Sequence, residues 1–447
     1  MARDPRRGRR DRALDRQVVA LALPALGALV AEPLFVLVDS AVVGRLGTAP
    51  LAGLALASTV LLTVVGLCVF LAYATTAAVA RRLGAGDLRG AMTLGVDGLW
   101  LAAGLGVVLG AGVGLAAPWL VTVLGADGDV ARHAVAYLRW SAPGLPGMLV
   151  VLASTGALRG LQDTRTPLWV AAGGAVLNAA LSVTLVLGAG MGIAGSGLGT
   201  SLAQLSMAGA LTAVVVRGAR RAGAPLRPAV AGIRSNIRAG APLLARTLSL
   251  RAAILLTVVV ATGLGPVALA GHQVVNAVWA LTAFALDALA IAAQALVGHA
   301  LGAGDVDRTR AVLRRTLQWG TGAGVVLGVA VATVAGVLPA AFSPDPQVRS
   351  AVTAGLLVAA VCLPVAGWVF VLDGVLIGAG DGRYLAGAGM LTLAAYVPVA
   401  WAVATWATGG AAGLAWLWAA FAGVFMAARA VVTGLRARGS RWMVVGA

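Results

Sequence analysis

Twelve long apolar stretches, separated by short polar or Gly/Pro-rich breaks, limit what this chain can fold into. A helix needs about 20 apolar residues to cross a bilayer, and every stretch is at least that long. Hydrophobic residues make up 60% of the chain and charged residues only 11%, whereas soluble domains carry about 25% charged residues. We therefore predict an all-α polytopic membrane protein. Its spans are expected near residues 18–43, 51–79, 91–116, 134–156, 167–188, 192–216, 240–262, 269–298, 315–337, 349–376, 384–407 and 411–434.

The arginines orient these spans. All 33 basic residues are arginine. Seven lie in the N-terminal arm, sixteen in the connections that follow the even-numbered spans, and four are counted with the C-terminal tail. The connections that follow the odd-numbered spans hold only Arg45, Arg132, Arg139 and Arg349. The positive-inside rule then places both termini in the cytoplasm, with the protein in the plasma (inner) membrane. The net charge of +17 is thus a topology signal that can also meet anionic lipid, and no nucleic-acid partner is expected.

Composition excludes several kinds of chemistry. The absence of lysine removes a Walker A motif and lysine-based enzymes. Cys68 and Cys362 both lie in apolar stretches and predict neither a disulfide nor a metal site. The three histidines are scattered, without the spacing of a metal cluster or of a nucleophile and its base. We therefore expect no enzyme, no cofactor and no metal.

An internal repeat divides the chain. Pro24 recurs as Pro242, and the sequence LGAGD at 83–87 recurs at 301–305 with the same separation, which we call the repeat offset. Such matches predict two six-helix lobes that share one orientation and are related by a pseudo-two-fold axis along the membrane normal. This is the usual build of an alternating-access transporter.

The repeat gives the expected domain boundaries. We expect a basic cytoplasmic arm (1–17), an N-lobe (18–216), an Arg-rich cytoplasmic linker (217–239), a C-lobe (240–435) and a cytoplasmic tail (436–447).

The first span carries unusual residues for a membrane helix, namely Pro24, Glu32, Pro33 and Asp39. A charge at mid-membrane costs roughly 2.5–3.5 kcal/mol on insertion scales, and a proline inside a helix costs roughly 3 kcal/mol. One interpretation is that this helix bends at Pro24, its hinge, and carries an ion or proton on Asp39. The alternative is a broken helix whose carboxylates lie near the interface.

The second half differs in its charges. The counterpart of Asp39 at the repeat offset is Thr257, while Arg246, Arg251, Asp287 and Asp373 lie in spans of the second half. Three roles are open for these four residues: a structural ion-pair network, the lining of the substrate route, or a second proton site. Glu32 either meets a cationic substrate or pairs with one of the arginines.

Several segments resemble the multidrug and toxic compound extrusion (MATE) family. These are VDSAVVGRLG ending the first span, ALRGLQDTRTPL after the fourth and GHQVVNAVWAL in the eighth. FALDALAIAAQALVGHALGAGD and VLDGVLIGAGD are similar to its DinF-like branch. The resemblance implies twelve helices in two lobes around a central cleft. It also implies export of organic, often cationic, compounds in exchange for H⁺ or Na⁺.

The resemblance also implies a coupling site in the N-lobe. Asp39 matches the family's first-helix aspartate, Pro24 its bending proline, Asn178 its helix-five asparagine and Thr200 a helix-six threonine. Typical members place an aspartate one turn after that asparagine, whereas this chain has Ser182. With one carboxylate fewer, we expect proton coupling rather than coupling to Na⁺.

Two functions remain open from the sequence. The first is an antiporter whose partners are a small organic substrate and the bilayer. The second is a flippase or exporter of a lipid-linked or amphipathic metabolite. Arg246 and Arg251 discriminate between them, because unpaired arginines would favour an anionic headgroup and paired ones a cationic substrate. We expect a monomer.

Overall fold

Every regular element in the part of the chain that the structure describes is a helix. A computed structural model describes the backbone of residues 5–446 and the side chains from Asp11 onward, except that of Glu32. The α-helices are α1 (Pro5–Val43), α2 (Thr48–Leu67), α3 (Phe70–Gly84), α4 (Leu88–Val123), α5 (Gly128–Ser141), α6 (Leu145–Gly160), α7 (Arg165–Val183), α8 (Ile193–Arg221), α9 (Val230–Gly263), α10 (Pro266–Gly302), α11 (Val306–Val334), α12 (Pro346–Gly378), α13 (Gly382–Trp406), α14 (Gly410–Trp418) and α15 (Met426–Arg438).

Within the described residues, twelve helical segments are long and apolar enough to cross a membrane, which confirms the predicted fold class. Three of these segments join two helices: α2 with α3, α5 with α6, and α14 with α15. A π-helical stretch, Ala419–Phe425, connects α14 to α15. The helix α1 continues without interruption through Pro24 and Pro33. The alternative of a broken first helix is therefore wrong.

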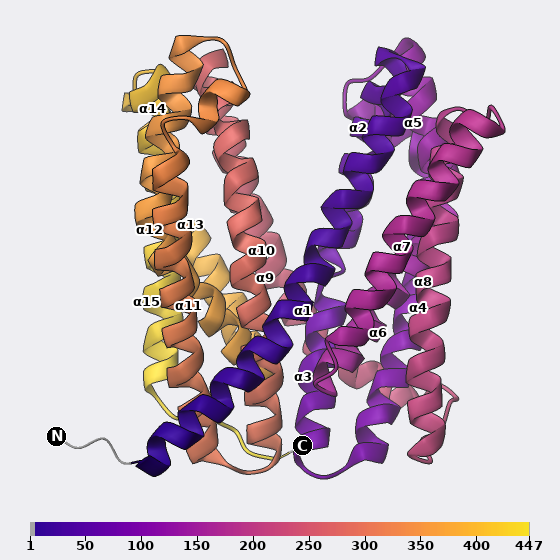
Figure 1. Cartoon of the computed structure of the whole chain (residues 1–447), viewed down its shortest axis with the longest axis vertical. Coiled ribbons are helices and arrows are strands. Elements are labelled where there is room, and N and C mark those ends of the chain that lie inside the picture. Colours follow the sequence, from indigo (N-terminus) through magenta and orange to yellow (C-terminus); the bar gives the residue numbers. More distant parts are fainter. Residues whose placement is uncertain (1–4, 447) are drawn as a thin grey trace. The chain divides into compact units, whose positions relative to one another are not determined.

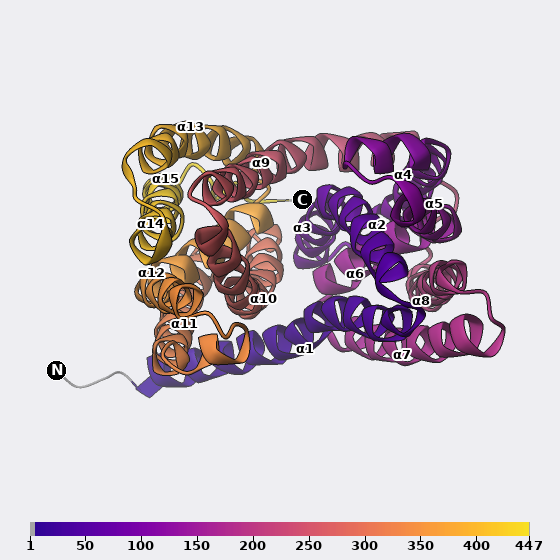
Figure 2. The same ribbon diagram turned by 90° about the horizontal axis from the view of Figure 1, so that it is seen from above.

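The chain forms two compact units (Figures 1 and 2). The N-terminal unit is Leu23–Gly240, and the C-terminal unit joins residues 5–22 to Ala241–Gly446. The boundaries fall inside α1 and α9, just before Pro24 and Pro242, and so lie at equivalent positions of the repeat. The predicted domain boundaries place residues 18–22 in the N-lobe, whereas compactness groups them with the C-terminal unit.

Each unit is built around one central helix. In the N-terminal unit α6 packs against α3, α4 and α8, and in the C-terminal unit α12 packs against α10, α11 and α14. Glycines allow this close approach at equivalent positions. A Cβ at Gly156 would lie 2.5 Å from the carbonyl oxygen of Ala72, and one at Gly374 would clash with the carbonyl of Ala290. Small residues let membrane helices pack backbone to backbone.

The repeated LGAGD sequence ends one helix and begins the next. Gly86 and Gly304 take positive φ angles of 78° and 73°, which stop the preceding helices. Asp87 and Asp305 then cap α4 and α11, because their carboxylates accept backbone N–H bonds at 2.7 and 2.8 Å. Caps of this type stabilise a helix start by about 1 kcal/mol. The motif is thus explained by local structure.

Candidate functional site

Four of the predicted site residues meet in the N-terminal unit. The Asp39 carboxylate accepts hydrogen bonds on Oδ1 from Asn178 Nδ2 at 3.2 Å and from the Ser182 hydroxyl at 2.6 Å. Its Oδ2 accepts one from the Thr200 hydroxyl at 3.1 Å. Asp39 is only 3% exposed, and Asn178 and Ser182 are fully buried. Asp39 therefore lies buried within the helical packing of this unit.

Helical spacing brings these side chains together. Asn178 and Ser182 are four residues apart on α7, and so lie on the same face one turn apart. Ser196 and Thr200 have the same spacing on α8. Because α7 packs against α8, these two faces bring polar side chains together, and Asp39 of α1 contacts them.

The sequence reasoning missed two members of this site. Tyr137 of α5 is buried and lies 3.3 Å from Thr200, oxygen to oxygen. Ser196 is fully buried beside Asp39. Its place one turn before Thr200 was a signal that could have identified it. No such signal existed for Tyr137, because its approach to α8 depends on the tertiary packing of α5.

Unused acceptors remain next to the carboxylate. Among the described atoms, Asn178 Oδ1 and Ser196 Oγ are buried without a hydrogen-bond partner. Unsatisfied buried polar atoms cost about 1–3 kcal/mol each, so these two oxygens need a hydrogen-bond donor. A proton on Asp39, donated to one of these oxygens, satisfies that need. A small cation among oxygen ligands would do so as well.

The donors that bind Asp39 are all neutral. Burying an ionised carboxylate costs several kcal/mol unless it is paired, and hydrogen bonds from an amide and two hydroxyls offset only part of that cost. Binding of a proton or a cation would neutralise the Asp39 carboxylate and remove the rest of this cost. This is the chemistry required of a coupling site.

The equivalent place in the C-terminal unit has no charge. There Thr257 replaces Asp39, and its hydroxyl lies 2.7 Å from the phenol oxygen of Tyr396. At the repeat offset, Tyr396 is the counterpart of Asn178, and Trp418 is the counterpart of Thr200. Both Tyr396 and Trp418 are fully buried in an aromatic cluster with Phe421. The second repeat thus has a hydrogen bond here but no carboxylate.

The C-terminal unit instead buries an ion-pair cluster. Asp373 of α12 pairs with Arg246 of α9 at 2.5 Å and with Arg429 of α15. Arg429 was counted with the three arginines of the predicted tail, although it falls within the predicted span 411–434, and counting it with the tail is wrong. It is 9% exposed and lies inside the last span, because α15 extends to Arg438.

The remaining predicted residues are placed as follows. Asp287 is half-buried on α10, and Arg251 is exposed on α9. Pro24 is half-buried on α1, next to the boundary between the two units. The side chain of Glu32 lies outside the described residues, and its predicted role stays a prediction.

Comparisons with known proteins agree with the repeat. A family model for MatE matches the chain twice, at residues 24–184 and 242–402, so the two matches are separated by the repeat offset seen in the motifs. The chain is 32% identical over 379 residues to the Arabidopsis thaliana protein DETOXIFICATION 44, chloroplastic, covering 82% of this chain and 72% of that one. It is 30% identical over 377 residues to the Escherichia coli DNA damage-inducible protein F, covering 82% and 81%.

A solved structure has the same fold. The Vibrio cholerae MATE transporter VcmN in the bent form superposes with a TM-score of 0.86 at 21% sequence identity. The match covers 96% of this chain and 97% of VcmN.

Proposed function

The chain belongs to the multidrug and toxic compound extrusion (MATE) family of membrane transporters, and on this premise we propose that it is a proton-coupled secondary antiporter that exports organic, often cationic, compounds. As a transporter it is not an enzyme, and its family is ion-coupled. The 30% identity to DNA damage-inducible protein F over four-fifths of both chains supports a place in the DinF-like branch.

One observation carries the choice of coupling site. Asp39 is a buried carboxylate with three neutral donors at 2.6–3.2 Å and unused oxygens beside it. When ionised, it is stabilised by Asn178, Ser182 and Thr200. When protonated, it can donate its own proton to an oxygen such as Asn178 Oδ1. An amide offers both a donor and an acceptor, so Asn178 can serve both states.

Proton coupling fits this chain better than sodium coupling. The position where typical members carry a second aspartate is Ser182, which donates directly to Asp39. A cation would have to displace these direct hydrogen bonds and would meet a single negative charge. A proton needs neither change.

Exchange requires that proton and substrate favour different states of the protein, because a ligand with equal affinity for both states shifts nothing. Pro24 is the proposed hinge, since a proline removes one backbone hydrogen bond of its helix. Loss of the proton from Asp39 changes how closely α7 and α8 can pack on α1. The bend at Pro24 would pass this change along α1.

The proposal also covers topology and assembly. Both termini lie in the cytoplasm, the protein acts as a monomer in the plasma membrane, and its lobes are 18–216 and 240–435. Arg246 is engaged with Asp373, which leaves it unavailable to an anionic headgroup. This pairing favours the antiporter over a flippase and supports a structural role for the Asp373 cluster. Arg251 is exposed and has no ion pair among the described side chains, so Arg246 alone of the two arginines meets the criterion for a cationic substrate.

The test is transport of a fluorescent cationic dye in proteoliposomes. A proton gradient and a sodium gradient are imposed separately on the wild type and on Asp39→Asn. We expect efflux driven by the proton gradient alone and abolished in Asp39→Asn. Asp97→Asn is the matched control, because Asp97 is the other aspartate of this unit that is almost fully buried, at 1% exposure, and it is not part of the site.

Two results would contradict the proposal. Efflux driven by sodium would reject the proton as coupling ion. Undiminished proton-driven efflux in Asp39→Asn would reject Asp39 as its carrier.

A further inference from the structure

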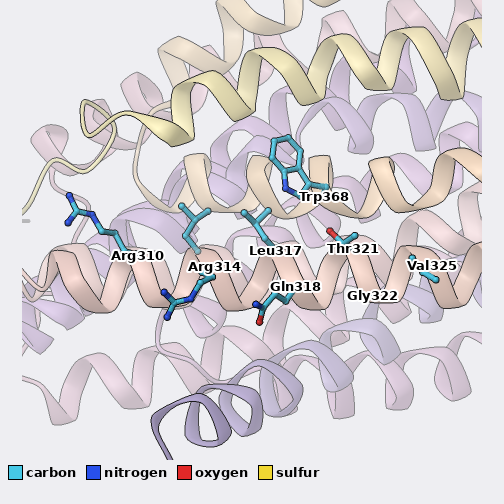
Figure 3. A pocket seen from close by; sticks show the side chains of 9 residues that line it. Arg310, Arg314, Leu317, Gln318, Thr321, Gly322, Val325 and Trp368 are labelled. Carbon is cyan, nitrogen blue, oxygen red and sulfur yellow. The ribbon is translucent and has the colours of Figure 1, made fainter. Parts of the chain in front are cut away.

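A groove runs along the outer face of α11 in the C-terminal unit. Its volume is about 620 Å³, and Figure 3 shows α11 forming one wall with Trp368 of α12 beside it. Arg310 and Arg314 lie at one end, near the start of α11. Apart from Gln318 and Thr321, the rest is apolar. The lining residues are Arg310, Leu313, Arg314, Leu317, Gln318, Thr321, Gly322, Val325 and Trp368.

The groove exists because the second repeat has lost a contact that the first repeat keeps. In the N-terminal unit Met92 of α4 packs on Gly218 of α8, where an added Cβ would lie 2.7 Å from the methionine methyl. Their counterparts at the repeat offset are Arg310 and Arg436. Arg310 is exposed and Arg436 pairs with Asp381, so the two side chains do not replace this contact. The surface between α11 and α15 is left uncovered over Trp368, which contacts Gly434 of α15.

No described carboxylate pairs with the two arginines at the end of the groove. Arg315 binds Asp15 at 2.5 Å, and Arg436 binds Asp381 at 2.6 Å. Among the described side chains, neither Arg310 nor Arg314 has a hydrogen bond or ion pair, and both are exposed. They are four residues apart and so point the same way from successive turns. Together they present two free guanidinium groups at one place.

We propose that this groove binds one anionic phospholipid. Arginine forms paired hydrogen bonds to phosphate oxygens, and basic pockets at the cytoplasmic ends of membrane helices bind anionic headgroups. Arg310 and Arg314 hold the phosphate. An acyl chain then lies along Leu317, Gly322 and Val325. The lining from residue 310 to 325 spans roughly 22 Å of helix, which is long enough for the headgroup region and most of one leaflet.

The first repeat lacks the residues that form the groove, which favours a specific lipid site over general lipid contact. At the positions equivalent to Arg310 and Arg314 it has Met92 and Val96, which are both buried. At the position equivalent to Trp368 it has Val150. The charged end and the aromatic wall therefore belong to the second repeat alone, and the same fold does not require them.

The test measures lipid retention by the full-length protein. Delipidated protein in detergent is titrated with dioleoylphosphatidylglycerol or dioleoylphosphatidylcholine, and bound lipid is counted by native mass spectrometry. We expect one phosphatidylglycerol to be retained well beyond phosphatidylcholine. Arg310→Gln with Arg314→Gln should weaken this retention by about 25-fold, since each arginine near an anionic lipid contributes about fivefold.

Matched variants separate the groove from surface charge. Arg217→Gln with Arg221→Gln removes two exposed arginines with the same spacing, at the end of α8, and should leave retention unchanged. An added Cβ at Gly322 meets open space, so the side chain of Gly322→Leu can occupy the groove. This change removes no charge and should abolish retention. Gly104→Leu is its control, at the equivalent position in the first repeat and equally open.

Three outcomes would overturn the proposal. The first is equal loss in the two double arginine variants, which would indicate nonspecific charge. The second is full retention in Gly322→Leu. The third is a dimer in the native spectrum that Gly322→Leu dissociates, which would make a second copy of the chain the occupant. Thermal melting of each variant shows that it is folded.

Discussion

The Ser182 hydroxyl provides the shortest hydrogen bond to Asp39, at 2.6 Å. A hydrogen bond to a charged group contributes about 1.5–3 kcal/mol. We predict that Ser182→Ala, which removes this donor from the ionised carboxylate, slows proton-driven dye efflux by roughly tenfold or more. Ser154→Ala is the matched control, because Ser154 of α6 is equally buried, forms no hydrogen bond among the described atoms and is not one of the groups around Asp39. Equal effects of the two changes would contradict the assignment.

Gln162 offers a residue-scale test of the repeat. It has a positive φ of 63°, while its counterpart Gly380 has 76°. Side chains make this region unfavourable by about 1 kcal/mol or more, and glycine removes the cost. We predict that Gln162→Gly raises the thermal midpoint of the protein and that Gly380→Gln lowers it. A lower midpoint for Gln162→Gly, or a higher one for Gly380→Gln, would contradict this prediction and show that the two turns are not equivalent.

At the scale of elements, the Asp373 cluster joins α9, α12 and α15. Removing one member of a buried ion pair typically costs about 3–5 kcal/mol, because the other charge stays buried. Asp373→Asn leaves Arg246 and Arg429 without their carboxylate, so we predict a stability loss of about this size in thermal or denaturant unfolding.

The exposed pair of Asp129 and Arg132 supplies the control for this prediction. Exposed pairs contribute about 0–1 kcal/mol, so Asp129→Asn should change stability little. A small effect of Asp373→Asn, with lost transport, would instead assign the cluster to the substrate route.

The elements themselves were largely predictable, and the site only in part. Continuous apolar length gave the twelve spans, because a bilayer allows few other folds. Asn178, Ser182 and Thr200 all came from a resemblance, Ser182 as the residue that stands where typical members carry a second aspartate. Tyr137 joins the site through the packing of α5 on α8, which no local pattern encodes. Arg429 was misplaced because a charge near the end of a chain is more often solvated than buried.

At the scale of the whole molecule, the two unit boundaries lie beside Pro24 and Pro242. If these prolines are hinges, replacing them restores a backbone hydrogen bond and stiffens the helix. We predict that Pro24→Ala slows efflux several-fold while the thermal midpoint stays the same or rises. Pro242→Ala should act in the same direction.

Pro33→Ala tests the position of this hinge. Pro33 lies in the same helix but away from the boundary, so its replacement should affect efflux less. A larger effect at Pro33 than at Pro24 would move the hinge away from the boundary.

We propose that binding of substrate and binding of a proton to Asp39 oppose each other. Adding a cationic substrate to purified protein in weakly buffered, sodium-free detergent solution should release protons, which a pH-sensitive dye records. We predict release by the wild type and by Ser154→Ala, and none by Asp39→Asn. Equal release by Asp39→Asn, or substrate binding without any release, would contradict it.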